Sequence, residues 1–302
     1  MLDLHRLRLL RELKHRGTLS AVATALQYSP SVISQHLSVL EREAGTPLLD
    51  HVGRRVKLTA QAELLVAHTE IILAQLELAE SDLAASLAGV TGTVRIASFQ
   101  TAALGLIPTV LKDLRTRHPQ LRAELLLTEP THSLPALQTR DFDLVIAEEL
   151  PGRPLPRAPH LEDRDLCTDR LRLAVQVGTG AVRLSDHALS PWVMEAPGNP
   201  ARDWAVARCR SAGFEPDVRY EATDLVVHQR LIEQGLAVGF LPDLLWLGRQ
   251  ITVALEADES SPMRSIVTVT RKGAGQHPAV QACREALARA AGTTQAGDRE
   301  KP

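Results

Sequence analysis

Cysteine is scarce in this sequence, with only Cys167, Cys209 and Cys283 among 302 residues. The three are odd in number and far apart, and they lack the CxxC spacing of a metal-binding loop, so neither a disulfide framework nor a zinc site is predicted. We interpret them as buried free thiols, with a redox-sensing cysteine as the alternative. The sequence thus predicts no metal site and no cofactor.

Long apolar runs are also missing. No stretch approaches the length needed to span a membrane, and the N-terminus opens directly into a charged amphipathic helix without the pattern of a signal peptide. We therefore expect a cytoplasmic protein with no membrane partner. Hydrophobic residues make up 44% of the chain, which is enough to build the cores of two or three domains.

Catalytic motifs are absent as well. The chain contains no GxSxG elbow, HExxH pair, P-loop or complete GxGxxG, and the glycine pair at Gly178 and Gly180 is followed by neither a third glycine nor Lys-Ser/Thr. Eleven histidines are scattered without a recognisable catalytic group. No catalytic residue is predicted, and we do not expect an enzyme.

Residues 18–59 carry the most informative pattern. Ser29 is placed as an N-cap and Pro30 at the first helical position, so a helix is predicted to begin near residue 30. Ile33, Leu37 and Leu40 recur at helical spacing and form its buried stripe. Its opposite face combines small and amide side chains, which can pair with base edges, rather than the Glu and Lys of a solvated helix. That polar face consists of Ser31, Ser34, Gln35 and Ser38.

Neighbouring segments complete a DNA-binding module. A short Ala-rich helix is predicted over 19–26 behind a Thr18 cap, preceded by an amphipathic helix marked by leucines at 4, 7, 10 and 13. After the capped helix, strands are predicted over 46–49 and 54–58, with Arg54, Arg55 and Lys57 projecting from a wing that contacts DNA phosphates or the minor groove.

Charge distribution supports this interpretation without proving it. The net charge is −2, but residues 1–60 hold nine Lys/Arg against five Asp/Glu, a surplus of +4, which leaves −6 for the remainder. Positive charge is therefore concentrated where the DNA phosphates would lie. Ordinary scatter is the alternative explanation for a surplus of this size.

Residues 1–60 resemble the winged helix-turn-helix of LysR-type transcriptional regulators. The similarity rests on GTLSAVATAL, SPSVISQHLSVLEREAG and GRRVKLT, which lie in register over about 40 residues. The chain departs from the family where Pro30 and Ser31 follow the capping serine in place of Gln and Pro, and where Leu49 replaces a common Phe. By this resemblance, and from the predicted polar face and wing, the DNA-contacting residues are Ser20, Ser29, Ser31, Val32, Ser34, Gln35, Ser38, Arg54, Arg55 and Lys57.

A long helical pattern without Pro or Gly follows at residues 59–88. Apolar residues repeat every seven positions along three adjacent stripes, forming a wide face that favours pairing with a second copy over packing on its own domain. Two-fold pairing lets two recognition helices read a partly palindromic DNA site, and the resemblance implies homodimers and homotetramers. The dimerisation residues are predicted to be Leu65, Thr69, Ile72, Leu76 and Leu83.

From Thr93 onward, strands alternate with helices, which predicts an α/β architecture with largely parallel sheets. A strand is expected over 93–99, a single helix over 101–118, and further strands over 121–127, 142–147, 171–177, 191–195, 218–221, 238–241 and 266–270. The region resembles the two-lobed, periplasmic-binding-protein-like effector domain of the same family. The predicted domains are therefore 1–60 for DNA binding, 61–90 for the linker helix and 91–302 for the effector domain. Within the last, lobe one covers 92–162 and 268–291, lobe two 163–267, and a disordered tail 292–302.

Such folds bind ligands beyond the strand ends, where helix N-termini expose N–H groups. Three turns qualify, although each could be simple helix capping, and by the resemblance the turn after the first strand is the best of them. Acidic residues near the same cleft, including Glu149 and Glu195, would repel a simple anion. An effector with an amino or other cationic group is therefore an alternative. The predicted effector-binding residues are Ser98, Gln100, Thr101, Ala102, Glu148, Asn199, Thr223 and Asp224.

The sequence thus predicts a sequence-specific transcriptional regulator that binds double-stranded DNA and is modulated by a small-molecule effector between two α/β lobes. The alternative is an α/β enzyme with an accessory DNA-binding module. An enzyme would consume its ligand, whereas a regulator would release it unchanged.

Overall fold

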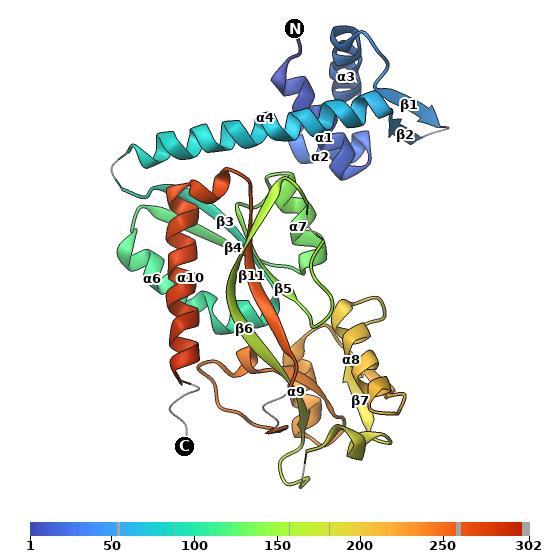
Figure 1. Cartoon of the computed structure of the whole chain (residues 1–302), viewed down its shortest axis with the longest axis vertical. Coiled ribbons are helices and arrows are strands. Elements are labelled where there is room, and N and C mark those ends of the chain that lie inside the picture. The colour runs from blue at the N-terminus through green and yellow to red at the C-terminus, as the bar shows by residue number, and fades with distance from the viewer. Residues whose placement is uncertain (53–54, 88, 157, 181, 258–260, 298–302) are drawn as a thin grey trace.

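The computed structural model describes residues 1–52, 55–87, 89–156, 158–180, 182–257 and 261–297. A small helical unit, here called the head (residues 1–58), and the long helix α4 lie at one end of an elongated α/β body (residues 92–297), as Figure 1 shows. Within the described residues, no helix is both long and apolar enough to cross a membrane.

Three capped helices form the head: α1 (Leu4–Arg16), α2 (Leu19–Leu26) and α3 (Pro30–Ala44). The predicted cap of α3 is present, because Ser29 Oγ accepts a hydrogen bond from the Val32 amide at 3.3 Å. Gly17 and Gly45 end α1 and α3 in the left-handed conformation that glycine adopts without strain. The predicted stripe of α3 is buried in the head core with Leu10 and Leu13 of α1.

The wing is an antiparallel hairpin of β1 (Leu49–Val52) and β2 (Arg55–Leu58). The prediction of a first strand over 46–49 was wrong by about three residues. The reason is that the amides of Leu48 and Leu49 donate to Glu41 Oε1 of α3, at 2.9 and 3.1 Å, so this segment is held by the helix before the hairpin begins. Arg54 lies outside the described residues, and so does the side chain of Arg55.

Helix α4 (Ala60–Ala85) is slightly shorter than the predicted 59–88 and has two different faces. One stripe packs on the chain itself and is made of Ala62, Val66, Thr69, Leu73, Glu77 and Ser81. The other is exposed and includes Leu64, Ile71, Ile72, Leu76 and Leu83. Thr69 was therefore wrongly assigned to the dimerising face, since it is fully buried and donates its hydroxyl to Leu65 O at 2.8 Å.

The body is built on a seven-stranded sheet that is mixed rather than largely parallel, a correction of the sequence prediction. Strand β3 (Gly92–Ser98) pairs in parallel with β4 (Leu121–Leu127) and β5 (Leu144–Glu149). Strand β11 (Met263–Arg271) pairs antiparallel with β5 and β6 (Leu161–Val175). Strands β9 (Gly239–Pro242) and β10 (Ala254–Leu255) also pair antiparallel with β6, whereas β7 (Pro191–Met194) and β8 (Asp217–Glu221) form a separate parallel pair.

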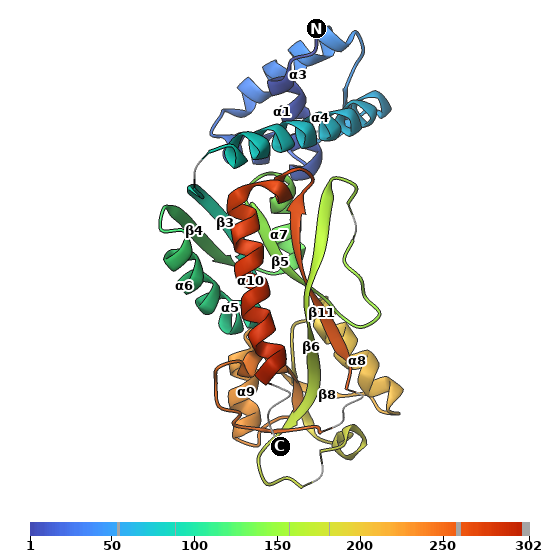
Figure 2. The same cartoon turned by 60° about the vertical axis from the view of Figure 1, so that its left-hand side comes forward.

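Strand β6 begins ten residues before the predicted strand at 171–177, and it runs with β11 from one lobe into the other (Figure 2). Its first half alternates charged residues, such as Asp163 and Arg164, with little hydrophobic signal. Backbone pairing with β11 holds this part of β6 in the sheet, although none of its first eight residues is buried. The predicted lobe limits at 162 and 268 therefore fall inside strands that both lobes share.

Helices cover both faces of the first lobe. Helices α6 (Ile107–Arg117) and α10 (Pro278–Gly297) pack beside each other on one face, and α7 (Pro130–Gln138) covers the other. The predicted single helix over 101–118 is instead α5 (Gln100–Gly105) followed by α6, with a break at Leu106. Helix α10 continues through Gly297, so the tail predicted to be disordered is helical up to that residue, and 298–302 lie outside the described part.

The second lobe has its own core. Helices α8 (Pro200–Ser211) and α9 (Leu225–Glu233) pack against β6, β7 and β9 around Trp192, Leu173 and Leu241. Short 3-10 helices occur at Leu184–His187, Asp243–Trp246 and Ala274–Gln276. The separate cores leave a crevice between the lobes, crossed by β6 and β11.

Candidate functional site

The polar face of α3 is open to solvent at every residue predicted for it: Ser31, Ser34, Gln35 and Ser38. Ser29 differs, because its oxygen caps the helix and lies 2.8 Å from Ser31 Oγ. Val32 is half-buried beside this face, Ser20 is exposed on α2, and Lys57 is exposed on β2. The surface therefore presents hydroxyl and amide groups from one helix, with a lysine on the wing.

An aromatic cluster beside α3 was missed by the sequence analysis. The His5 ring lies 5.3 Å from that of His36 and 6.2 Å from that of Tyr28. Tyr28 directly precedes the capping serine and is 44% exposed. The aromatic residue just before the helix cap could have been noticed in the sequence. Its contact with His5 could not, because that contact depends on how α1 packs against α3.

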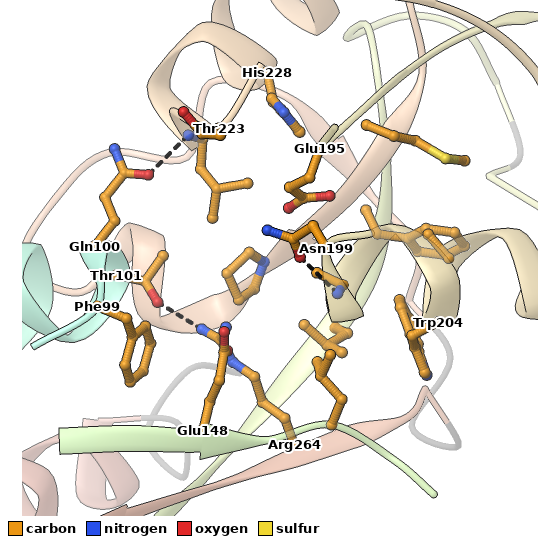
Figure 3. Close-up of a pocket in the computed structure, with 18 of the residues that line it drawn as sticks. Phe99, Gln100, Thr101, Glu148, Glu195, Asn199, Trp204, Thr223, His228 and Arg264 are labelled. Atoms are coloured by element: carbon orange, nitrogen blue, oxygen red, sulfur yellow. Dashed lines mark hydrogen bonds and ion pairs between the residues drawn. The ribbon is translucent and has the colours of Figure 1, made fainter. Parts of the chain in front are cut away.

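A pocket opens between the two lobes, where the first turn of α5, the end of β5, β11 and the starts of α8 and α9 converge (Figure 3). Of the eight predicted effector residues, Gln100, Thr101, Glu148, Asn199 and Thr223 line it. The other three do not. Ser98 is fully buried and donates to Phe99 O, Ala102 belongs to the core of lobe one, and Asp224 caps α9.

Arg264 of β11 is the central charged group of the pocket and was not predicted. Its guanidinium is 4% exposed and donates to Asp169 Oδ2 from Nε at 2.9 Å and from Nη2 at 2.6 Å. It also donates to Glu148 Oε2 and, at 2.6 Å, to Thr101 Oγ1, and it lies 5.2 Å from the centre of the Phe99 ring. These contacts occupy Nε and both terminal nitrogens, so little of its charge is left for an anionic ligand.

Two carboxylates that face the pocket have no cationic partner in the described part of the chain, Glu129 and Glu195. Burial raises the pKa of Glu195 above its ordinary value; attraction to His228 opposes this effect and repulsion from Glu148 adds to it. Desolvation likewise raises the pKa of Glu129, helped by repulsion from Glu148 and Glu195. The His228 ring also faces the pocket, and its Nε2 donates to Ala222 O at 2.8 Å. The pocket is therefore acidic.

The rest of the lining is apolar. Trp204 and Phe240 meet edge to face with ring centroids 5.0 Å apart, and Leu150, Leu171 and Met194 extend the same wall. Figure 3 shows the Glu195 side chain projecting toward the middle of the pocket, between His228 and Asn199. The pocket thus places an unpaired acid beside an aromatic wall.

Gln100 joins the two sides of the crevice. Its Nε2 donates to Asp224 Oδ1 at 2.6 Å, and its Oε1 accepts from the Leu225 amide at 2.8 Å. A side chain from the first turn of α5 in lobe one therefore satisfies a free N–H at the start of α9 in lobe two. The same contacts explain why Asp224 does not line the pocket.

The three thiols are poorly suited to redox chemistry. Burial raises the pKa of Cys167 to about 11, and those of Cys209 and Cys283 each to about 12. The thiolate is the reactive form, so these side chains remain almost entirely protonated at neutral pH. Cys209 and Cys283 are buried free thiols as predicted, whereas Cys167 is a free thiol that is only half-buried.

Comparison with known proteins identifies the family. Residues 4–63 match the model described as bacterial regulatory helix-turn-helix protein of the lysR family, and residues 87–292 match the LysR substrate binding domain. The chain belongs to the LysR family. It is therefore a transcriptional regulator with a DNA-binding helix-turn-helix and an effector-binding domain, as the sequence predicted.

Individual LysR-family relatives are distant. The transcriptional dual regulator GltC of Bacillus subtilis is 26% identical over 249 residues, covering 80% of this chain and 81% of its own. The hydrogen peroxide-inducible genes activator of Haemophilus influenzae is 23% identical over 290 residues, covering 90% of each chain. Among solved structures, a full-length OxyR variant from Pseudomonas aeruginosa matches with a TM-score of 0.69 and 16% identity over 95% of both chains. CbnR in complex with its target DNA matches with a TM-score of 0.54 and 20% identity, covering 96% of this chain and all of that one.

Proposed function

We propose that this LysR-family regulator responds to a small molecule that carries a positively charged nitrogen and an apolar group. The observation that supports this most strongly is the Glu195 carboxylate, which forms no ion pair among the described residues and faces a pocket in which the buried Arg264 is already held by Asp169 and Glu148. An ammonium group would pair with Glu195, and an apolar substituent would pack on Trp204 and Phe240. An anionic effector would instead meet uncompensated negative charge.

Matched ligands test the charge requirement. We expect an arylalkylamine to bind the purified full-length protein by titration calorimetry, and its carboxylate and alcohol analogues of equal length to bind much more weakly. Glu195→Gln should weaken amine binding by about 1.5–3 kcal/mol, roughly 10- to 150-fold in Kd, because it removes a charge-assisted hydrogen bond. Glu215→Gln, on the exposed surface and paired with Arg210, is the control. Preferential binding of the carboxylate would refute the proposal.

The DNA-binding part of the proposal assigns base contacts to Ser31, Ser34, Gln35 and Ser38. These side chains are exposed on one face of α3, and they match the donor and acceptor chemistry of base edges in the major groove. Ser20 and Lys57 are assigned to phosphates, together with Arg54 and Arg55 from the sequence pattern. Ser29 and Val32 are assigned to shaping the start of α3.

We further propose that the protein is a homodimer, and in its assembled form a homotetramer, with α4 as the pairing element. The exposed stripe of α4 holds Ile72, Leu76 and Leu83, which are 45%, 37% and 67% exposed in the single chain. A row of large exposed apolar side chains, on a helix whose neighbouring stripe is already buried against the chain itself, is typical of a helix that packs on a partner. Leu65 is half-buried at its edge.

The pocket is proposed to bind its effector without chemical change. No nucleophile with an adjacent base stands out among the described lining residues, where Thr101 accepts from Arg264 and His228 is held by a backbone carbonyl. Mass spectrometry of the ligand after prolonged incubation with the protein should recover it intact. Stoichiometric or catalytic conversion would favour the enzyme alternative.

A further inference from the structure

A cluster of possible metal ligands lies outside both sites described above, at the junction of the head with the body. His15 from the last turn of α1, Glu70 from α4 and His160 from the turn before β6 each offer one ligand atom, and these atoms all lie within 4.8 Å of one another. His15 Nε2 is 2.8 Å from Glu70 Oε1. We propose that His15, Glu70 and His160 bind a divalent transition-metal ion of the zinc type.

The state of His160 supports this assignment independently of the clustering. Its Nε2 is buried and has no hydrogen-bond partner in the described structure. A buried polar atom left unpaired costs free energy, so such an atom calls for a reason.

The separations suit a small transition-metal ion after modest adjustment. Metal–nitrogen and metal–oxygen bonds of about 2.0–2.1 Å place tetrahedral ligand atoms about 3.3 Å apart. His15 and Glu70 are slightly closer than this, and the widest spacing in the cluster needs to contract by at most about 1.5 Å, which side-chain rotation can provide. Two imidazoles with one carboxylate favour zinc and its neighbours over magnesium or calcium, which prefer oxygen ligands.

The groups around the cluster are arranged as outer partners of a metal site. Arg11 Nε donates to Glu70 Oε1 at 2.9 Å and so orients the carboxylate, as groups behind a metal ligand commonly do. The nearby cations are offset by acids, since Lys14 pairs with Glu63 at 2.5 Å. Arg16 pairs with Glu12 at 2.8 Å and with Asp141 at 3.1 Å. Net repulsion of an incoming cation is thereby reduced.

The placement of the ligands gives the ion a structural consequence. One ligand belongs to the DNA-binding head, one to α4 and one to the body, so a bound ion would join all three (Figure 1). Two hydrogen bonds already cross the same junction, from Arg16 to Asp141 and from Arg11 to the carbonyl of Gln138. Metal binding would add a coordinate link to these exposed or half-buried contacts and hold the head in one orientation.

Direct metal binding is the first test. Full-length protein stripped with a chelator and titrated with Zn²⁺ should take up about one ion per chain that survives gel filtration. His15→Ala and His160→Ala should each raise the Kd at least about tenfold, as loss of a ligand costs no less than loss of an outer partner. His68→Ala removes an exposed histidine of α4 from outside the cluster and should leave the Kd unchanged.

A second pair of histidines needs its own control. His5 and His36 lie close together in the head, so the double variant His5→Ala/His36→Ala should retain the ion. In unsubstituted protein loaded with Co²⁺, X-ray absorption should report two imidazoles and a carboxylate at tetrahedral distances, which does not depend on how any variant folds. The proposal would be overturned if the protein bound no ion, if both His15→Ala and His160→Ala kept the ion, or if the His5→Ala/His36→Ala variant lost it.

An effect on DNA is a separate readout that depends on the proposed function. Zn²⁺ should change the affinity of the unsubstituted protein for its DNA site at least about threefold, and His160→Ala should abolish that change. If the ion binds but DNA affinity does not move, the site is structural only and the DNA-binding proposal is unaffected. If the protein binds Zn²⁺ but does not bind DNA either with or without the ion, the proposed function fails and the metal site remains.

Discussion

At the scale of single residues, the crevice is organised by Arg264. Its side chain links Thr101 of lobe one to Asp169, whose other oxygen accepts from the Leu244 amide at 2.8 Å. A buried charge is tolerated only when it is paired and its hydrogen-bonding groups are satisfied, and Arg264 meets both conditions. The residue thereby supports the floor of the pocket as well as the contact between α5 and the second lobe.

Loss of Arg264 should be costly for stability. Arg264→Met leaves Asp169 buried with an uncompensated charge, and we expect it to lower the free energy of unfolding by about 3–5 kcal/mol. Arg289→Met breaks an exposed pair with Asp113 and should cost at most about 1 kcal/mol. Denaturant titration monitored by tryptophan fluorescence would compare the two. Equal effects would show that the Arg264 network contributes no more than a surface pair.

A base-reading role of Gln35 can be separated from backbone binding. Gln35→Ala should relax preference at one base position by about 1–3 kcal/mol, because an amide can pair with adenine through two hydrogen bonds. Lys57→Ala should instead weaken binding to all sequences and flatten the salt dependence by about one unit. Selection of binding sites from random DNA, repeated at several salt concentrations, measures both. An unchanged motif for Gln35→Ala would remove it from the base contacts.

Binding of a cationic ligand should depend on pH through Glu195. The ionised carboxylate attracts an ammonium group, and burial raises the pKa of Glu195, so affinity is present above that raised pKa and is lost as the pH falls through it. The loss should therefore begin at a higher pH than for an ordinary glutamate. Calorimetry from pH 7.5 downward should show this decline, whereas Glu195→Gln should bind weakly with a flatter profile.

At the scale of elements, α4 has two roles that periodicity alone could not separate. The repeat of seven correctly indicated apolar stripes, but it could not show which stripe the chain would bury for itself. Packing against the head and body uses the stripe of Ala62, Val66 and Leu73, leaving Ile72 and Leu76 exposed. The exposed apolar residues, including these two, are the ones available to a partner.

Charge placed on the exposed stripe should separate the subunits. The double variant Ile72→Glu/Leu76→Glu should sediment as a monomer, since burying two carboxylates in an apolar contact is strongly unfavourable. Ala207→Glu introduces a charge at an exposed position of α8, in the second lobe and away from α4, and should leave the assembly intact. A dimeric double variant would place the interface elsewhere on the chain.

At the scale of the whole molecule, the two lobes are held together by the shared strands and by Gln100. Gln100→Ala should increase hydrogen exchange at the Leu225 amide, because that N–H loses its acceptor and the start of α9 is freed from lobe one. Gln234→Ala removes an exposed glutamine at the other end of α9 and is the matched control. Unchanged protection of the Leu225 amide in the Gln100 variant would show that the shared strands alone hold the two lobes together.

Sequence reasoning succeeded where local chemistry decides structure. The cap at Ser29, the proline at position 30 and the leucine stripe of α3 act within a few residues of one another, so the helix and its polar face could be predicted from them. The family resemblance followed from the same segment. Turn residues such as Gln100 and Asn199 could be placed at the crevice because they follow or precede regular elements.

Only the tertiary structure determined the contacts between segments that are far apart in the sequence. Arg264 reaches Glu148 and Thr101 across 116 and 163 positions, and His160 approaches His15 from the opposite half of the chain. Such groups carry no local signal, since their pairing depends on how β11 enters the sheet and how α1 and α4 lie on the body. Helix starts and buried stripes are set by short-range hydrogen bonds and periodicity, whereas the charge of the pocket and the junction is set by long-range packing.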